Sequence, residues 1–328
     1  MKYQNLISWG VLFLSLILFS IGVAKKILHM NQNVQEKSNV IAVIPKGTAS
    51  IWWEVVHKGA LDAGAEEQYE IAWNGPEQEN DREKQIQVVE DAMNKNAAAI
   101  VLAPNDFRAL ARPVNNIKEK GTPCVIIDSA VDTESYDSFV GTDNILCGAD
   151  AARVMGKVLG GKGNILIIRF IQNSASTDAR AKGFVDTIKK EFPNIKILSE
   201  QYTQGTVEDA RQKTVDLLTR YPDVDGIFSC NQPTSVGTYK AIQNQNLAGK
   251  VKFVAFDSDA TLVSGLRANE VTAIIAQDPY KVGYLGVKTA VRLLKGEKQE
   301  RSISVAGMIV TKENLEQTIK ENSAALGL

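Results

Sequence analysis

The chain has 328 residues, of which 44% are hydrophobic and 23% are charged, and its formal net charge is -1. This composition is typical of a globular protein of about two domains. A net charge near zero, without a sustained basic run, cannot neutralise a phosphate backbone, so we expect no nucleic-acid partner.

A near-continuous apolar run extends from Leu6 to Ala24. Residues 1–24 are therefore expected to be either a cleaved signal peptide or an uncleaved signal-anchor, with a buried core helix as a third alternative. Residues 25–38 are expected to form a linker. Both export alternatives place the rest of the chain in the periplasm or otherwise outside the cytoplasm, touching the membrane only through an uncleaved leader.

From Val40 onward, short apolar runs alternate with helical patterns, which predicts parallel sheets wrapped by helices. The first series comprises strand Val40–Ile44, a helix including Trp52–Ala63, strand Tyr69–Trp73, helix Glu83–Asn94, strand Ala98–Ala103, helix Arg108–Lys120, and strand Cys124–Asp128 followed by a loop. The second comprises Asn164–Arg169, helix Ala179–Glu191, Ile195–Glu200, helix Val207–Arg220, Gly226–Ser229, helix Ser235–Gln245, Val251–Phe256, Thr272–Ala276, helix Val282–Leu294 and a terminal strand Ile303–Val310. Two such series predict two doubly wound α/β lobes.

Polar residues follow several of the predicted strands, at the sheet edge where ligands bind in doubly wound folds. They are Lys46, Asn105, Asp106, Asp128, Ser129, Asn231, Gln232, Asp257, Gln277 and Asp278. No Gly-rich phosphate loop follows a strand, which argues against a nucleotide. The glycine-rich segment Gly160–Gly163 precedes a strand and is predicted to be a turn.

The sequence offers little for catalysis or metal binding. The two histidines, His29 and His57, belong to no metal-ligand pattern, so no metal or cofactor is expected. His57 is the one histidine candidate for the base of a hydrolase triad, but a plain surface or interlobe helix position is the simpler interpretation. Asp128 with Asp257 is weighed as the carboxylate pair of a glycosidase. An enzyme therefore remains an unsupported alternative.

Three cysteines, Cys124, Cys147 and Cys230, occur in small or apolar settings without a C-x-x-C motif. We interpret them as buried thiols. One disulfide with one thiol left over stays open as an alternative, because the sequence does not fix the geometry.

The polar residues present suit the recognition of a neutral polyol. Carboxylates accept hydrogen bonds from hydroxyls, amides both donate and accept, and arginine donates in a planar fork. The pair Trp52-Trp53 stands at the start of the first helix, where aromatic rings can cover the apolar face of a sugar. Neighbours on a helix lie ~100° apart, so one ring is expected to face the cleft, with packing between helix and sheet as the alternative.

In combination, these segments resemble the type I periplasmic substrate-binding proteins of ABC sugar importers, in the ribose-binding branch, and are also similar to the autoinducer-2-binding relatives. The resemblance covers residues 39–312. The motifs that carry it are Ile44-Pro45-Lys46 followed by Trp52-Trp53, Gly141–Asn144, Ser174–Ser176, Arg180–Phe184, Gly226–Asn231, Val254–Asp257, Ala276-Gln277 and Gly283–Gly286.

The resemblance implies a set of ligand-binding residues and no catalytic residue. The set comprises Lys46, Trp52, Trp53 and Asp128 in the first lobe, Arg180, Asn231 and Asp257 in the second, and Gln277 at the hinge. Ribose binders typically have arginine where this chain has Ser129, and asparagine where it has Ser50. Lys46 and Asp178 resemble the autoinducer-2 pattern, whereas Ala179 departs from it. The implied ligand is therefore sugar-like without being fixed as ribose.

The resemblance also implies the architecture and the partners. Three crossovers are expected near 141–143, 277–279 and 305–307. They divide the chain into an N-terminal lobe of residues 39–142 plus 279–306 and a C-terminal lobe of residues 143–277 plus 307–328. Such lobes close about their hinge on a ligand.

The resulting expectation is a monomeric extracytoplasmic receptor that delivers a small sugar to the membrane subunits of an ABC permease. The alternative is a membrane-anchored sensory receptor that presents bound sugar or autoinducer-2 to a chemoreceptor or sensor kinase. A transcriptional repressor of similar architecture is disfavoured, because an apolar run stands where a basic helix-turn-helix head would be required.

Overall fold

The computed structural model describes residues 38–326 and residue 328. The predicted leader, the linker up to residue 37 and His29 lie outside the described residues. The segment from Asn39 to Leu328 forms one compact unit. Within the described part, no helix has both the length and the apolar character needed to cross a membrane.

The first lobe is built on a parallel sheet. Its strands and the helices that pack on them are β1 (Val40–Ile44), α2 (Ile51–Glu67), β2 (Glu70–Trp73), α3 (Arg82–Asn94), β3 (Ala99–Leu102), α4 (Ala111–Glu119), β4 (Cys124–Ile127), β5 (Ser138–Thr142), α10 (Pro279–Leu294) and β11 (Ser302–Val305). The six-stranded sheet has the order β11-β5-β4-β3-β1-β2, and each neighbouring pair is parallel.

The second lobe repeats this arrangement. Its elements are α5 (Asn144–Val158), β6 (Lys162–Arg169), α6 (Ala175–Glu191), β7 (Asn194–Tyr202), α7 (Val207–Arg220), β8 (Gly226–Ser229), α8 (Gln232–Asn244), β9 (Lys252–Phe256), α9 (Ala260–Arg267), β10 (Ala273–Ala276), β12 (Met308–Val310), α11 (Leu315–Asn322) and a short 3-10 helix, η1 (Ser323–Leu326). The strand order is β12-β10-β9-β8-β6-β7, and only the edge strand β12 of this sheet is antiparallel to its neighbour. β4 and β9 therefore occupy equivalent places in the two sheets.

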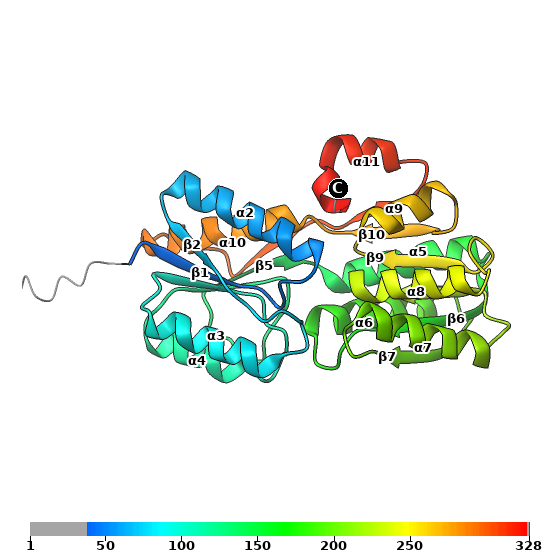
Figure 1. Ribbon diagram of the computed structural model, residues 1–328, viewed down its shortest axis with the longest axis horizontal. Helices are drawn as coiled ribbons and strands as arrows, with labels where there is room; N and C mark the ends of the chain where they lie inside the picture. Colours follow the sequence, from blue (N-terminus) through cyan, green and yellow to red (C-terminus); the bar gives the residue numbers. More distant parts are fainter. Residues whose placement is uncertain (1–37, 327) are drawn as a thin grey trace, which may run out of the picture. The chain divides into compact units, whose positions relative to one another are not determined.

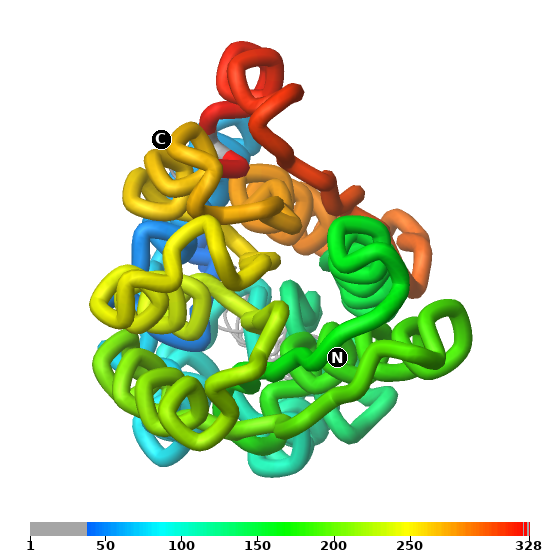
Figure 2. The backbone as a smooth tube through the Cα atoms, turned by 90° about the vertical axis from the view of Figure 1, so that its right-hand side faces the viewer, coloured from blue at the N-terminus to red at the C-terminus, as the bar shows by residue number. Residues whose placement is uncertain are grey.

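Helices cover both faces of each sheet (Figure 1). In the first lobe, α2 and α10 pack on one face, and α3 and α4 pack on the other. In the second lobe, α5 and α6 cover one face while α7, α8 and α9 cover the other (Figure 2). Central strands such as β3 are buried along their whole length, which explains their continuous apolar sequences. The predicted fold class of two doubly wound α/β lobes is confirmed.

Glycines allow two helix pairs to pack at backbone distance. A Cβ on Gly283 of α10 would lie 2.0 Å from the carbonyl oxygen of Val56 in α2. A Cβ on Gly148 of α5 would lie 2.0 Å from the carbonyl oxygen of Arg180 in α6. Real Cβ atoms do not approach this closely, so both glycines are required by the packing. The α5–α6 contact thereby fixes the backbone of Arg180.

The predicted element order contains two kinds of error: elements that were not predicted, and two strands that were predicted as one. The loop and gap predicted after Asp128 contain strand β5 and helix α5. β5 is short and includes Gly141, and α5 includes Gly148 and Gly156, so residues of low intrinsic propensity weaken both patterns. The helices α9 and α11 were also not predicted.

The second error is the terminal strand predicted over Ile303–Val310. It is two strands in different sheets, β11 and β12. They separate at Ala306-Gly307, where a Cβ on Gly307 would lie 2.3 Å from the Sγ of Cys147. Because both halves are apolar, hydrophobicity alone does not reveal the break. The turn predicted over Gly160–Gly163 is confirmed at Gly160 and Gly161, with φ of 61° and 78°, whereas Lys162 and Gly163 already belong to β6.

Candidate functional site

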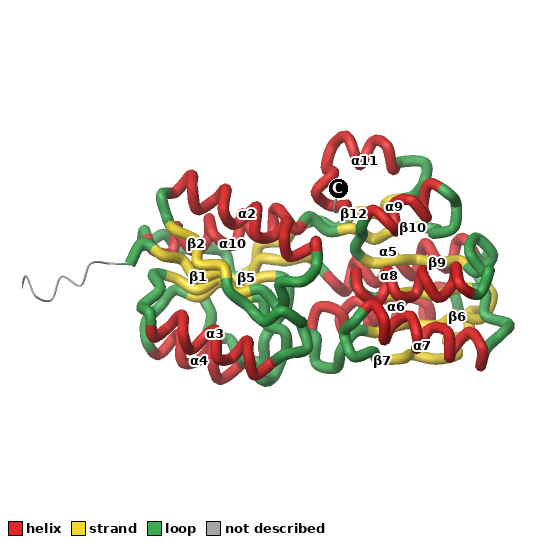
Figure 3. The backbone as a smooth tube through the Cα atoms, in the orientation of Figure 1, coloured by secondary structure: helices red, strands yellow, loops and turns green. Residues whose placement is uncertain are grey.

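Loops at the ends of both sheets meet between the two lobes (Figure 3). The residues that line a pocket come from these loops and from the helices beside them. Residues from both lobes line this central pocket: Lys46, Ser50, Trp52, Trp53, Glu79, Asp128, Ser176, Thr177, Arg180, Asn231, Gln232, Pro233, Asp257 and Gln277. The structure thus brings together all eight residues that the sequence nominated. Much of this convergence follows from what we call the strand-end rule: residues that directly follow parallel strands gather at one edge of a sheet, where the carboxyl ends of the strands lie.

Asp128 and Asp257 are equivalent residues of the two lobes. Asp128 follows β4 and Asp257 follows β9, with φ of 60° and 58°. The backbone N–H of each donates to a carbonyl of the next strand in its sheet, Val140 and Ile275, at 2.9 Å. A left-handed conformation is uncommon for residues with a side chain and is concentrated at functional sites. The helix that follows β9, α9, is capped by Asp259 and not by Asp257.

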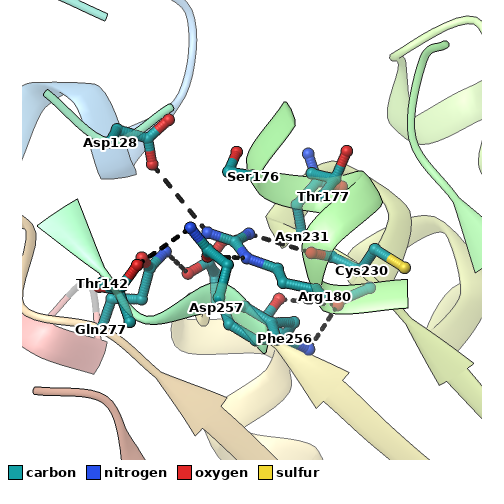
Figure 4. Close-up of polar contacts among 12 residues, drawn as sticks. Asp128, Thr142, Ser176, Thr177, Arg180, Cys230, Asn231, Phe256, Asp257 and Gln277 are labelled. Carbon is teal, nitrogen blue, oxygen red and sulfur yellow. Dashed lines mark hydrogen bonds and ion pairs between the residues drawn. The ribbon is translucent and has the colours of Figure 1, made fainter. Parts of the chain in front are cut away.

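Arg180 lies between these two carboxylates (Figure 4). Its Nη1 is 3.5 Å from Oδ2 of Asp257, and its Nη2 is 4.0 Å from Oδ1 of Asp128. Nε donates to Oδ1 of Asn144 at 2.8 Å, and Nη1 donates to the carbonyl of Cys230 at 3.0 Å. The guanidinium also lies 3.9 Å from the centre of the Phe256 ring. Contacts on all sides hold this buried cation in one orientation.

Lys46 joins the two lobes inside the pocket. Its Nζ lies 2.6 Å from Oδ2 of Asp128 and donates to Oγ of Ser176 at 2.9 Å. The backbone N–H of Ser176 in turn donates to Oγ of Ser129 at 3.0 Å. Lys46, Asp128 and Ser129 follow strands of the first sheet, whereas Ser176 opens α6 of the second lobe. The lobes are therefore in direct contact at the pocket, in a closed arrangement.

The carboxyl of Asp257 is held by several neighbours. Nε2 of Gln277 donates to its Oδ1 at 2.8 Å, and the backbone N–H of Gln232 is a further donor. Burial nevertheless raises the pKa of Asp257, and the nearby charge of Asp128 adds to this effect, while Arg180 and the two donors oppose it. A polar ligand that donates to Asp257 would favour its ionised form.

The tryptophan pair lies at the pocket as the resemblance implies, whereas helix geometry alone gave a different expectation. One ring was expected to face the cleft, yet both Trp52 and Trp53 line the pocket, with their rings edge to face at 4.6 Å. Trp53 is 2% exposed and its Nε1 donates to Oε1 of Glu79 at 2.8 Å. The buried Nε1 of Trp52 has no hydrogen-bond partner among the described residues.

Sequence reasoning missed several residues that line the pocket, notably Ser50, Glu79, Ser176 and Thr177. Glu79 lies on the loop that follows β2, so the strand-end rule applied to that strand would have included it. Burial raises the pKa of Glu79, opposed first by the charge of Lys46 and then by the hydrogen bond from Trp53. Ser176 was part of a quoted motif but was given no role.

Other residues after strands serve the scaffold. Asp106 accepts backbone hydrogen bonds from Arg108 and Ala109. Asp278 caps α10. Asn231 both lines the pocket and caps α8, since its Oδ1 accepts from the backbone of Thr234.

Three further features bear on catalysis. His57 stacks on Trp73 with ring centres 4.4 Å apart and does not line the central pocket. All three cysteines are buried free thiols, as interpreted, and burial raises the pKa of each. Within residues 38–326 and 328, no three His, Cys, Asp or Glu side chains are placed to hold a metal ion.

The model of the periplasmic binding protein domain matches residues 41–298, most of the chain. The chain belongs to the periplasmic binding protein family. This periplasmic binding protein is 29% identical over 265 residues to the D-allose-binding periplasmic protein of Escherichia coli, covering 78% of this chain and 85% of that one. It is 25% identical to the ribose import binding protein of Bacillus subtilis, over 69% and 72% of the two chains.

Solved structures resemble this periplasmic binding protein along nearly their whole length. A carbohydrate transporter solute-binding protein of Agrobacterium radiobacter in complex with D-arabinose is 32% identical, with a TM-score of 0.85 and coverage of 88% of this chain and 99% of that one. An ABC transporter solute-binding protein of Agrobacterium vitis with bound D-fucose is 34% identical, with a TM-score of 0.84 and the same coverage. The resemblance stated from the sequence is confirmed.

Proposed function

We propose that this protein is an extracytoplasmic receptor that binds a small neutral sugar between its lobes and delivers it to the permease of an ABC importer, without catalysis. The observation that carries the proposal is the placement of Arg180 between Asp128 and Asp257, at a pocket lined by both lobes. The sugar-binding relatives named above support the same class of ligand.

The pocket chemistry suits hydroxyl groups. Asp128 and Asp257 accept hydrogen bonds from hydroxyls, and Arg180 donates to them. Trp52 and Trp53 offer rings to the C–H face of a sugar, as is usual for aromatic side chains beside polar groups. The eight nominated residues are therefore proposed as ligand contacts, with Ser176 and Glu79 beside them.

Binding requires the lobes to separate. The central pocket has a volume of about 30 Å³, far below the range of small-molecule sites, about 300–1,000 Å³. A sugar therefore enters an open form and replaces the contacts of Lys46 with Asp128 and Ser176. Since the ligand bonds both walls only in the closed form, it shifts the population toward closure.

The three connections between the sheets are the proposed hinge. They lie between β5 and α5, between β10 and α10, and between β11 and β12. We propose that the lobes predicted from the sequence, 39–142 plus 279–306 and 143–277 plus 307–328, move as rigid bodies about them. The closed monomer then presents to the permease a surface that the open form lacks.

A thermal-shift screen across pentoses, hexoses, deoxysugars, polyols and autoinducer-2 tests the proposal. At 100 times Kd, a ligand adds about 2.7 kcal/mol to the free energy of unfolding. The expected result is a rise in Tm of about 5–10 °C for one sugar or a few related sugars. Sugar acids serve as a charged control and are expected to give no shift. Absence of any shift in the panel, or conversion of a bound sugar to product, would contradict the proposal.

A further inference from the structure

A second cavity adjoins the central pocket. This outer cavity has a volume of about 440 Å³ and is lined by Gly47, Ala49, Ser50, Ile51, Trp53, Glu77, Gln78, Glu79, Gly205, Thr206, Val207, Gln232, Pro233, Asp259 and Ala260. It shares Ser50, Trp53, Glu79, Gln232 and Pro233 with the central pocket. The two spaces therefore meet at these five residues.

The outer cavity is large enough for a ligand group even in the closed arrangement. Its volume falls in the range of small-molecule sites, about 300–1,000 Å³. The central pocket, by contrast, has a volume of about 30 Å³. The closed arrangement of the lobes, in which the central pocket is small, therefore still contains a second and larger space beside it.

The two walls of the outer cavity offer complementary hydrogen-bonding groups. The first lobe contributes the carboxylates of Glu77 and Glu79, which accept hydrogen bonds. The second lobe contributes the first residues of three helices, Val207 of α7, Gln232 of α8 and Ala260 of α9, of which Gln232 already donates its backbone N–H to Asp257. The first turn of a helix carries backbone N–H groups without partners inside the helix.

This combination selects the chemistry of an occupant. No lysine, arginine or histidine is among the lining residues, and the carboxylates repel an anion. Apolar side chains, namely Ile51, Trp53, Val207 and Pro233, line part of the space, where they can contact the C–H faces of a sugar ring. The hydroxyls of a neutral polyhydroxy group can donate hydrogen bonds to the carboxylates of the first lobe and accept hydrogen bonds from backbone N–H groups of the second.

We propose that the physiological ligand is a disaccharide or other glycoside, with its inner ring in the central pocket and a second sugar unit in the outer cavity. This inference rests on the proposed function and extends it. Glu79 lines both spaces and therefore stands at the junction of the two units. Its Oε1 accepts a hydrogen bond from Nε1 of Trp53, and this bond holds the carboxyl at the junction.

Filling the outer cavity provides the test. Ala49 is exposed and lines the cavity without belonging to a packed core, so Ala49→Trp fills the space and leaves the fold intact. Ala268, exposed at the C-terminal end of α9, lines neither cavity, and Ala268→Trp is the matched control. Isothermal titration calorimetry compares monosaccharides with disaccharides that contain them, for both variants and the unaltered protein.

The expected result is a disaccharide that binds about tenfold or more tightly than the monosaccharide of its inner ring. Ala49→Trp is expected to remove this advantage while leaving the affinity for the monosaccharide unchanged, and Ala268→Trp to change neither. Glu77→Gln is a second, smaller probe, expected to weaken binding of the disaccharide alone.

Other outcomes overturn the inference. Binding of monosaccharides without binding of any disaccharide overturns it and leaves the proposed function standing. Equal losses of affinity for the monosaccharide and the disaccharide in Ala49→Trp, or no loss for either, also overturn the inference and leave the proposed function standing. Failure of every saccharide, mono or di, to bind the unaltered protein overturns the proposed function itself.

Discussion

Replacement of Arg180 by alanine is expected to abolish sugar binding and to lower the free energy of unfolding by about 3–5 kcal/mol, because it leaves buried carboxylates without their cation. Arg180 is 2% exposed and contacts both Asp257 and Asp128. Titration calorimetry measures the binding loss, and denaturant unfolding measures the stability loss.

Arg169→Ala is the matched control. Arg169 also forms ion pairs, with Asp178 at 2.7 Å and Glu200 at 3.1 Å, but it does not line the central pocket. Its loss is expected to reduce stability while sugar affinity is kept. Retained sugar binding in Arg180→Ala, or equal binding losses in the two variants, would contradict the role assigned to Arg180.

Replacement of Asp257 by asparagine is expected to weaken sugar binding by about 100-fold, since each hydrogen bond to a charged group contributes about 1.5–3 kcal/mol. The substitution preserves size and removes the charge that faces Arg180. Asp178→Asn is its control, because Asp178 is ion-paired to Arg169 outside the pocket. Sugar affinity that is unchanged in Asp257→Asn would remove Asp257 from the site.

The same variant carries a prediction on pH. Burial raises the pKa of Asp257 in the folded, unliganded protein, so the folded state holds this proton more tightly than the unfolded state. The stabilisation of the folded state by this bound proton is fully present below the pKa of Asp257 in the unfolded chain, about 3.9. It is lost as the pH rises through the pKa of Asp257 in the folded protein. Unfolding of the two unliganded proteins across this range is expected to show the unaltered protein losing stability relative to Asp257→Asn as the pH rises.

The two-lobed fold and most of the strands were predictable because the central strands are buried on both faces. β3 and β8 are short apolar runs that stand out from the polar helices around them. β5 and α5 escaped prediction because their glycines serve close packing, as at Gly148, which cannot be recognised without the neighbouring helix. The break between β11 and β12 escaped for a related reason, since Gly307, at the break, packs against a distant cysteine that the local sequence does not reveal.

The candidate site was predictable where a residue follows a strand. Asp128 and Asp257 were found on this rule, and the structure shows that they occupy equivalent positions of two similar sheets. The rule gives no orientation, because it also applies to Asp106, which was not nominated for the site and whose carboxyl accepts hydrogen bonds from its own loop. Arg180 lies within a helix and was nominated through the family resemblance alone.

The contacts across the pocket were not predictable from the sequence. The bond from Lys46 to Ser176 joins residues 130 positions apart in separate lobes. Glu79 was missed although it follows β2, and its bond to Trp53 depends on the packing of α2 against that loop. These contacts depend on how the two lobes close, which local patterns do not encode.

The crystal structure of the complex with the sugar that gives the largest thermal shift tests the central claim most directly. The account predicts an intact sugar between the lobes, with hydroxyl groups within hydrogen-bond distance of Arg180, Asp128 and Asp257, and with Lys46 moved from its contact with Ser176. A sugar bound elsewhere on the surface, or a cleaved or otherwise altered sugar in the pocket, would contradict it.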